Sequence, residues 1–226
     1  MESTYWLAKA MIKPTVGPWL KWNIEGLENI PRQGGALLAV NHISYLDPLV
    51  AAYIVDKAKR RPRFLGKSDL FDDKRIGWIL RGAGQIPVKR GTSEAPMALD
   101  QAVAAVQKGE IVVIFPEGTI TTDPDLHPMA AKTGISRLAL MTRAPVIPMA
   151  MWGTANIWPK GFRKHWWPPG QDVLIRIGKP MRIEGDIDNP EDWARGGEMV
   201  MDEIATLLAG VRPAVPDRRR PKKTAA

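Results

Sequence analysis

One short stretch, AVNHISYLDPLV at residues 39–50, carries a histidine and an aspartate five positions apart. An imidazole can take a proton from a hydroxyl group while a carboxylate orients the ring, and a free histidine is mostly neutral at physiological pH, as a base must be. A second interpretation is structural. His42 is then a loop residue and Asp47 caps a helix that Pro48 opens, because aspartate is favoured at the N-cap and proline at the first helical position. The two residues alone leave both interpretations open.

Other polar side chains also follow apolar runs. Glu117 and Thr119 lie in FPEGT, which continues the β-branched run IVVIF, and Lys89 and Arg90 end the stretch GQIPVKR. Open α/β sheets place their ligand crevices at the carboxyl ends of the strands. If these runs are strands of one parallel sheet, their polar ends meet at a common edge.

Apolar runs alternate with helical patterns along the chain, which predicts the elements that must position these groups. The predicted strands are 34–40, 62–67, the end of 77–90, 111–115, 145–151 and 172–178. The predicted helices are 47–59, 95–110, 132–144 and 191–210. Nearly continuous apolar strands between helices predict a single α/β domain, with a largely parallel or mixed sheet covered by helices on both faces.

Three elements carry further expectations. Residues 172–178 alternate between apolar and polar, as an antiparallel or edge strand does. Pro148 lies inside an apolar strand and therefore requires a bulge or an edge position. Helix 191–210 is expected to be interrupted at its glycine pair.

Composition excludes several classes of protein. The chain has 226 residues and no cysteine, which rules out disulfides and thiol chemistry. No stretch reaches the eighteen or more apolar residues that a spanning helix needs, so we expect a soluble or surface-bound intracellular protein. The net charge of +8 favours anionic partners. His127 and His165 show no metal-ligand spacing, and no metal site is predicted.

Residues 1–22 mix aromatic and basic side chains, as an element lying in the headgroup layer of a membrane does. An N-terminal helix packed on the domain explains the pattern equally well. We therefore predict an N-terminal interfacial segment at 1–22, a catalytic or binding domain at 23–212 and a basic, disordered tail at 213–226. The tryptophans and lysines of the segment are Trp6, Trp19, Trp22, Lys9, Lys13 and Lys21.

Taken together, these stretches resemble the glycerolipid acyltransferase family, whose typical member is the lysophosphatidate (1-acylglycerol-3-phosphate) acyltransferase. The family signature of Asn-His, four residues and Asp matches Asn41, His42 and Asp47, and its third block, Phe-Pro-Glu-Gly-Thr, matches residues 115–119. FLGKSDLF and KTGISRLAL also look like family segments. The resemblance covers roughly residues 20 to 180, and the two blocks are specific together because they occur in order.

The resemblance implies a glycerol-3-phosphate acyltransferase-like fold and direct acyl transfer. His42 would take the proton of an acceptor hydroxyl while Asp47 orients its ring. The donor would be the thioester of acyl-CoA or acyl carrier protein, and the acceptor a lysophospholipid, with lysophosphatidate expected; no other cofactor is implied. The expected substrate-binding residues are Arg90 and Lys89 for the acceptor phosphate, Glu117 for a glycerol hydroxyl, and Gly118, Thr119, Lys67 and Lys132.

The sequence departs from the family pattern in two places. Ile120 stands where the family usually has an arginine that helps to hold the acceptor phosphate, and Lys89 precedes Arg90 where the family has aspartate. Another glycerolipid or a glycolipid acceptor therefore stays open, as does a non-catalytic lipid-binding module. We expect a peripheral or monotopic protein on the cytoplasmic face of the cell membrane. No groove-reading or base-stacking motif supports nucleic-acid binding.

Overall fold

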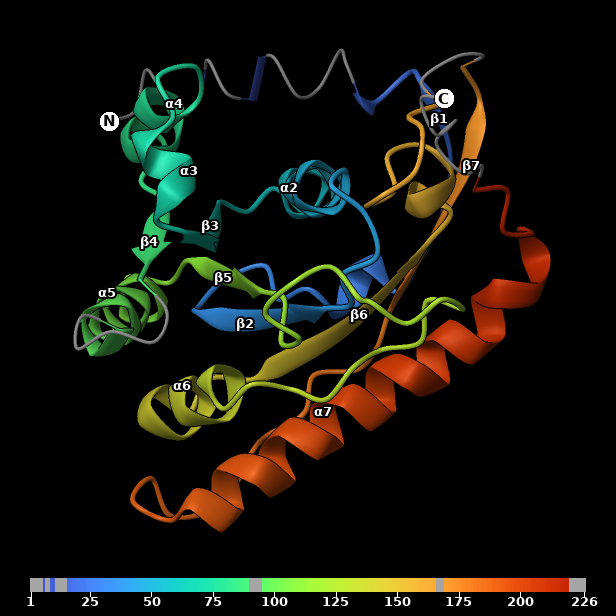
Figure 1. The fold of residues 1–226 in the computed structure, drawn as a ribbon. Helices are drawn as coiled ribbons and strands as arrows, with labels where there is room; N and C mark the ends of the chain where they lie inside the picture. The colour runs from blue at the N-terminus through green and yellow to red at the C-terminus, as the bar shows by residue number, and fades with distance from the viewer. Residues whose placement is uncertain (1–5, 7–8, 11–15, 90–94, 166–168, 220–226) are drawn as a thin grey trace.

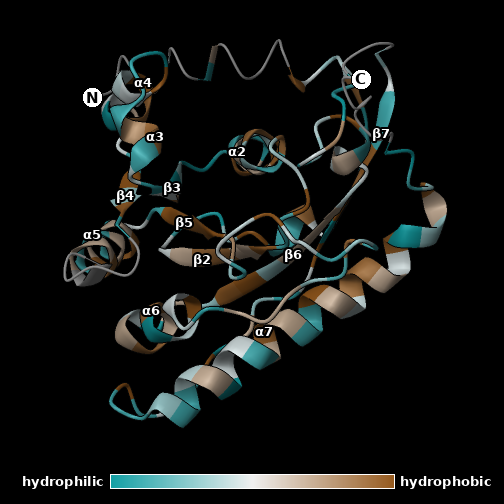
Figure 2. Cartoon of the chain, viewed as in Figure 1, coloured by the Kyte–Doolittle hydropathy of each residue, from teal (hydrophilic) through white to brown (hydrophobic). Residues whose placement is uncertain are grey.

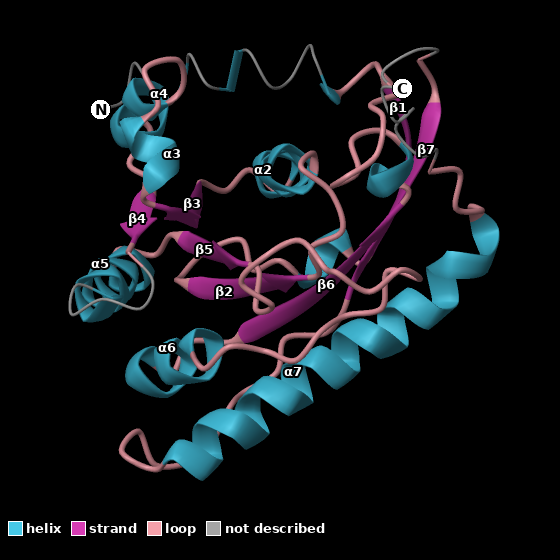
Figure 3. Cartoon of the chain, in the orientation of Figure 1, coloured by secondary structure: helices cyan, strands magenta, loops and turns pink. Residues whose placement is uncertain are grey.

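The computed structural model describes residues 6, 9–10, 16–89, 95–165 and 169–219. Its centre is a seven-stranded sheet in the order β1-β7-β6-β2-β5-β3-β4 (Figures 1 and 3). All pairings are parallel except β6 with β7. The strands are β1 (Leu20–Glu25), β2 (Ala36–Val40), β3 (Pro62–Lys67), β4 (Ile86–Val88), β5 (Ile111–Ile114), β6 (Val146–Trp152) and β7 (Gln171–Ile177).

Helices cover both faces of this sheet. Helix α2 lies on one face, and α5, α6 and the long α7 lie on the other, while α3 and α4 sit beside β3 and β4 at one end (Figure 1). Brown, apolar segments gather between the layers and teal segments line the outside (Figure 2). The helices are α2 (Asp47–Lys57), α3 (Asp69–Asp72), α4 (Gly77–Gly82), α5 (Ala95–Gln107), α6 (Gly134–Thr142) and α7 (Pro190–Val211).

The period-two alternation of a strand divides the core into two layers. Leu37 and Ala39 of β2 belong to the apolar cluster that contains α5, α6 and α7 residues. Leu38 and Val40 belong to the cluster that contains α2 residues. All five residues of β2 are buried, because a parallel strand covered on both faces has no solvent side. The predicted α/β fold with a mixed, doubly covered sheet is confirmed.

β1 is the strand that the sequence did not predict. Leu20–Glu25 pairs in parallel with β7 over its whole length. The boundary that we predicted between residues 22 and 23 therefore falls inside a strand of the sheet. Because β1 occupies the edge, β7 is an interior strand. The antiparallel pairing predicted for β7 is confirmed, and the edge position is wrong.

The chain accommodates Pro148 in an interior strand through a bulge. Val146 pairs with Met181, and Met149 pairs with Ile177. From one pair to the next the chain advances three residues in β6 but four in 177–181, so one extra residue lies in 177–181. The carbonyl of Pro148 accepts a hydrogen bond from the amide of Gly178 at 2.8 Å, beyond the regular ladder. The expected bulge is therefore present.

α7 and the segment after it differ from the sequence-based expectation. The helix runs unbroken for 22 residues, so the predicted interruption at its glycine pair is wrong. The following residues pack on the core: Val215 is buried, and its carbonyl accepts from Trp152 Nε1 at 2.6 Å. The expectation of disorder from residue 213 is therefore wrong for the described part of the tail, and residues 220–226 lie outside it.

Three neighbouring parallel strands, β6, β2 and β5, end at the same edge of the sheet. The segments that follow them carry the predicted chemistry: His42 after β2 and Glu117 after β5. Within the described residues, no helix combines the length and the apolarity needed to cross a bilayer.

Candidate active site

Asn41 fixes the start of the loop after β2. Its side chain donates to the carbonyl of Met151 at 3.0 Å and accepts from the amide of Met151 at 2.7 Å. Asn41 is fully buried, and its amide completes the hydrogen bonding between β2 and β6 where the regular ladder ends. The asparagine before the histidine thus has a structural role: it ties the start of the His42 loop to β6.

The carboxylate of Asp47 turns back toward this loop. Its Oδ2 accepts from the backbone amides of Ile43 at 2.7 Å and Ser44 at 2.8 Å, and lies 2.8 Å from His42 Nδ1. The helix α2 begins at Asp47 itself, with Leu46 as a cap residue that makes no side-chain cap bond. The interpretation of Asp47 as a helix cap is therefore wrong, since its carboxylate satisfies loop amides rather than helix amides.

This geometry fixes the proton on one side of the imidazole. Two backbone amides donate to Asp47 Oδ2, so the oxygen is an acceptor and His42 Nδ1 must donate to it. The neutral ring then has its lone pair on Nε2, for which no hydrogen-bond partner is found among the described residues. The His42 side chain is 15% exposed, enough for Nε2 to meet a hydroxyl group. The arrangement is that of a general base with its orienting carboxylate.

Thr154 completes the surroundings of Asp47. Its hydroxyl donates to Asp47 Oδ1 at 2.6 Å, and both side chains are fully buried. Thr154 begins the 3₁₀ turn that follows β6, 107 residues after Asp47 in the chain. Sequence reasoning missed it; the available signal was its place shortly after the predicted strand 145–151.

Glu117 and Phe115 hold His42 from the β5 side. Glu117 Oε1 accepts from the amide of His42 at 2.8 Å, and Oε2 accepts from the amide of Met129 at 3.0 Å. Burial raises the pKa of the Glu117 carboxyl, and these two amides oppose the rise. The Phe115 ring stacks on the imidazole, with centroids 4.2 Å apart. Because both carboxylate oxygens are engaged by amides, Glu117 positions the loop, and the expectation that it meets a glycerol hydroxyl stays a prediction.

The remaining residues of the third block lie beside this contact. Gly118 has φ of 76°, a conformation that favours glycine, and its amide donates to the carbonyl of Phe115 at 2.9 Å. Thr119 is exposed and Ile120 is buried. An apolar, buried Ile120 offers no donor to a phosphate group.

The predicted cations are spread along the same sheet edge. Lys67 and Lys89 are exposed at the ends of β3 and β4, and Lys67 forms an ion pair with Asp69. Lys132 is exposed, and its backbone amide donates to the carbonyl of Pro116 at 2.8 Å. Arg90 lies outside the described residues. The assignment of these side chains to substrate binding stays a prediction.

The hydroxyl of Ser44, in the histidine loop, has a structural role. Its Oγ donates to the carbonyl of Trp158 at 2.8 Å and accepts from the amide of Leu46 at 3.0 Å. The residue is fully buried. A hydroxyl engaged on both sides does not serve as a nucleophile, which agrees with direct transfer to the acceptor.

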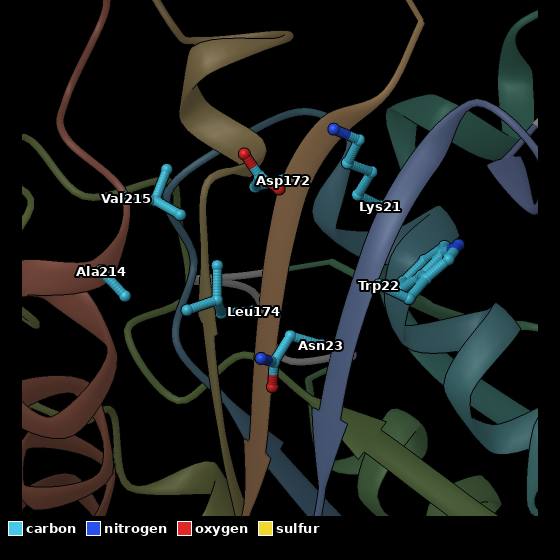
Figure 4. A pocket seen from close by; sticks show the side chains of 7 residues that line it. All are labelled: Lys21, Trp22, Asn23, Asp172, Leu174, Ala214 and Val215. Atoms are coloured by element: carbon cyan, nitrogen blue, oxygen red, sulfur yellow. The ribbon is translucent and has the colours of Figure 1, made fainter.

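Two other features involve no side chain of the histidine loop. The structure brings ligand atoms of Asp123, Asp125 and His127 within 4.8 Å of one another on an exposed loop, so the expectation that His127 has no carboxylate at metal-ligand distance is wrong. A cavity of about 360 Å³ lies between β1, β7 and the segment after α7 (Figure 4). Its lining includes Lys21, Asp172 and Val215 and no residue of the histidine loop.

Comparison with known proteins places this geometry in a family. The acyltransferase family model matches residues 21–152, more than half of the chain. The chain is 33% identical over 182 residues to a chloroplast 1-acyl-sn-glycerol-3-phosphate acyltransferase of Brassica napus, covering 78% of this chain and 50% of the relative. It is 29% identical over 154 residues to the 1-acyl-sn-glycerol-3-phosphate acyltransferase of Bacillus subtilis, covering 68% and 70%.

The fold also has a solved counterpart. The crystal structure of the 1-acyl-sn-glycerophosphate acyltransferase of Thermotoga maritima superposes with a TM-score of 0.66 at 24% identity, over 92% of this chain and 79% of that one. The chain spans about half the length of the plant relatives that it matches. The family resemblance seen in the sequence is confirmed, and the chain belongs to the acyltransferase family.

Proposed function

We propose that the protein transfers a fatty acyl chain from a thioester to a hydroxyl group of a lysophospholipid, with lysophosphatidate as the acceptor and phosphatidate as the product. The observation that carries the proposal is the 2.8 Å contact between His42 Nδ1 and Asp47 Oδ2, which leaves Nε2 for the acceptor hydroxyl. The names of the relatives support the acceptor class. The donor is acyl-CoA or acyl carrier protein, and the reaction requires no metal.

The acyl group passes directly from the thioester to the acceptor, without an acyl-enzyme intermediate. As the acceptor oxygen attacks the thioester carbonyl carbon, its proton passes to His42 Nε2. Asp47 stabilises the resulting imidazolium, because its carboxylate contacts Nδ1 and is fixed in place by two amides and a hydroxyl. The tetrahedral intermediate then collapses, the carbon–sulfur bond breaks, and the imidazolium returns the proton to the leaving thiolate. General-base help of this kind contributes about 10²–10⁴-fold.

The test compares two histidines that each pair with an aspartate. His42→Ala removes the buried base, whereas His127→Ala removes an exposed ring whose Nδ1 lies 3.1 Å from Asp123 Oδ1. Purified protein is incubated with lysolipids and labelled acyl-CoA or acyl carrier protein, and products are identified by mass spectrometry. We expect loss of turnover in His42→Ala only. Full turnover in His42→Ala, with an unchanged circular dichroism spectrum, would remove His42 from the mechanism.

We further propose that the protein docks peripherally on anionic membranes, at the cytoplasmic face of the cell membrane. Trp6 is 56% exposed and Lys9 lies over its ring at 4.9 Å, a pairing suited to the headgroup layer. Trp6→Ser should lower vesicle binding about tenfold, since burying a large apolar side chain contributes roughly 1.5–3 kcal/mol. Met199→Ser, which changes an exposed apolar residue of α7, is the control. Equal vesicle binding by both variants would exclude Trp6 from the docking surface.

A further inference from the structure

A second cavity adjoins the histidine loop. It has a volume of about 420 Å³ and is formed by Tyr45 and by the segment after β6, which supplies Trp158, Phe162, Arg163 and Lys164. Hydrogen bonds join its two walls: the amide of Tyr45 donates to the carbonyl of Trp158 at 3.1 Å, beside the Ser44 bond to the same carbonyl. The wall that carries Tyr45 is thus the loop that positions His42.

The lining combines aromatic faces with positive charge. Lys164 Nζ lies 3.9 Å from the centre of the Trp158 ring, and the rings of Tyr45 and Trp158 have centroids 6.0 Å apart. Arg163 and Lys164 are exposed, and Tyr45 is 50% exposed although it lies in the active-site loop. Cations beside aromatic planes suit a phosphate ester attached to a flat or apolar group. Among the described residues that line the cavity, none carries a carboxylate to oppose an anion.

We propose that this cavity binds the phosphate-bearing end of the phosphopantetheine thioester donor. The inference rests on the proposed function and assigns a place to its donor. Tyr45 follows His42 by three residues, so their Cα atoms lie at most about 11 Å apart. A long pantetheine arm can reach from such a cavity to the imidazole, whereas the phosphate of lysophosphatidate is separated from its hydroxyl by only a few bonds. CoA and acyl carrier protein both present this phosphate, and CoA adds an adenine that the rings can stack on.

The experiment measures binding without turnover. Dissociation constants of CoA, 4′-phosphopantetheine and pantetheine are determined for the wild type and for Arg163→Gln/Lys164→Gln, with Lys160→Gln as a control because Lys160 is exposed in the same segment and does not line the cavity. We expect the double variant to bind CoA and 4′-phosphopantetheine about tenfold more weakly, ~1.4 kcal/mol, and pantetheine unchanged. Unchanged CoA and 4′-phosphopantetheine affinity, or an equal loss for pantetheine, would overturn the proposal.

A kinetic arm separates the two donors and the acceptor. The KM of acyl-CoA and of acyl carrier protein should rise in the double variant for whichever donor the enzyme uses, while the KM of the lysophospholipid stays constant. A rise in the acceptor KM alone would reassign the cavity to the acceptor and overturn the proposal. His42→Ala should bind CoA as tightly as the wild type, so failure of the catalytic assignment and failure of the cavity assignment give different results.

A separate observation concerns the far side of Asp47. We infer that Thr154 is a positioning residue that fixes the carboxylate of Asp47 through the 2.6 Å bond to Oδ1. The family model ends at residue 152, before this turn. Because Asp47 Oδ2 serves His42 and two amides, the Thr154 hydroxyl is the described partner that holds the remaining oxygen.

Thr154→Val keeps the shape and removes the donor, while Thr154→Ser restores it. We expect Thr154→Val to lower kcat about tenfold with little change in the acceptor KM, because the carboxylate is no longer fixed in the orientation that aligns the imidazole. The acidic limb of the kcat/KM profile should shift to higher pH, because a carboxylate with one donor fewer attracts the imidazolium more strongly. Thr154→Ser should recover both. Thr206→Val, on the outer side of α7, is the control. An unshifted limb, or Thr154→Ser behaving as Thr154→Val, would contradict a positioning role.

Discussion

Glu117 Oε1 accepts a hydrogen bond of 2.8 Å from the backbone amide of His42, which joins the loop after β5 to the loop after β2. The carbonyl of His42 in turn accepts from the amide of Thr121 at 2.7 Å. Both polar backbone groups of His42 are therefore held by residues 117–121, in the third sequence block and just after it. The two blocks that characterise the sequence form one hydrogen-bonded unit in space.

Glu117→Gln should weaken this unit. Glutamine has one oxygen and one amino group, so one of the two buried amides, of His42 or Met129, loses its acceptor and faces a donor. We expect unfolding to require ~1–3 kcal/mol less, and kcat to fall because the imidazole is no longer fixed. Urea unfolding and steady-state kinetics measure the two effects. A variant with wild-type stability and kcat would show that neither amide depends on Glu117.

Asp47→Asn should separate the charge of the carboxylate from its geometry. The amides of Ile43 and Ser44 will orient the asparagine oxygen toward themselves and toward His42 Nδ1. The imidazole therefore keeps its proton on Nδ1 and its lone pair on Nε2. Only the stabilisation of the imidazolium is lost, and we expect kcat to fall by about 10²-fold, within the range of general-base effects.

Asp47→Ala is the informative comparison for this variant. It leaves the Ile43 and Ser44 amides without an acceptor, which should cost ~1–3 kcal/mol of unfolding free energy for each amide. Asp47→Asn should therefore be clearly more stable than Asp47→Ala in thermal and urea unfolding. Equal stability would mean that the amides do not depend on residue 47.

Two glycines of α7 should respond oppositely to alanine. A Cβ at Gly196 would lie 2.6 Å from Ile183 Cγ2 and 3.2 Å from Ser136 Cβ, so Gly196→Ala should destabilise the protein by about 1–3 kcal/mol. A Cβ at Gly210 has nothing within 4 Å, and Gly210→Ala should stabilise it by roughly 0.5–1 kcal/mol. Urea unfolding of both variants is the measurement, and a stabilising Gly196→Ala would contradict the close packing of α7.

Asp192 should make stability depend on pH at the start of α7. The backbone amide of Asp186, at 2.7 Å, and the guanidinium of Arg195 hold the pKa of the Asp192 carboxyl below its ordinary value of 3.8. A lowered pKa in the folded state means that the contribution is present above pH 3.8 and is lost as the pH falls through the lower folded-state value. Asp192→Asn should therefore be less stable than the wild type at pH 7, and the difference should shrink below pH 3.8. A difference that stays constant with pH would exclude this linkage.

Sequence periodicity identified most of the fold but not its first edge. β2, β5 and β6 were predicted from their continuous apolar runs, which indicate burial on both faces of the sheet. β1 was missed because LKWNIE alternates and follows a tryptophan- and lysine-rich segment, a pattern that is typical of several surface elements. Its state is decided by β7, about 150 residues away, with which it pairs.

The continuity of α7 was likewise decided by distant contacts. Glycine weakens a helix locally, which favoured an interruption at Gly196 and Gly197. In the structure these positions allow α7 to approach Ser136 and Ala131, and a side chain at either position would crowd those neighbours. Packing of the helix outweighs the local preference of the glycines.

The sequence by itself determined the chemistry of the candidate site: a histidine and an aspartate at fixed spacing, a Phe-Pro-Glu-Gly-Thr block, and strands that end beside them. It did not determine the partners of those groups. The tertiary structure decided that Asp47 serves His42 rather than a helix end, that Glu117 holds the His42 amide, and that Thr154 meets Asp47. These contacts join segments that adjacent parallel strands bring to one edge, and strand order is set by pairing over long distances rather than by local pattern.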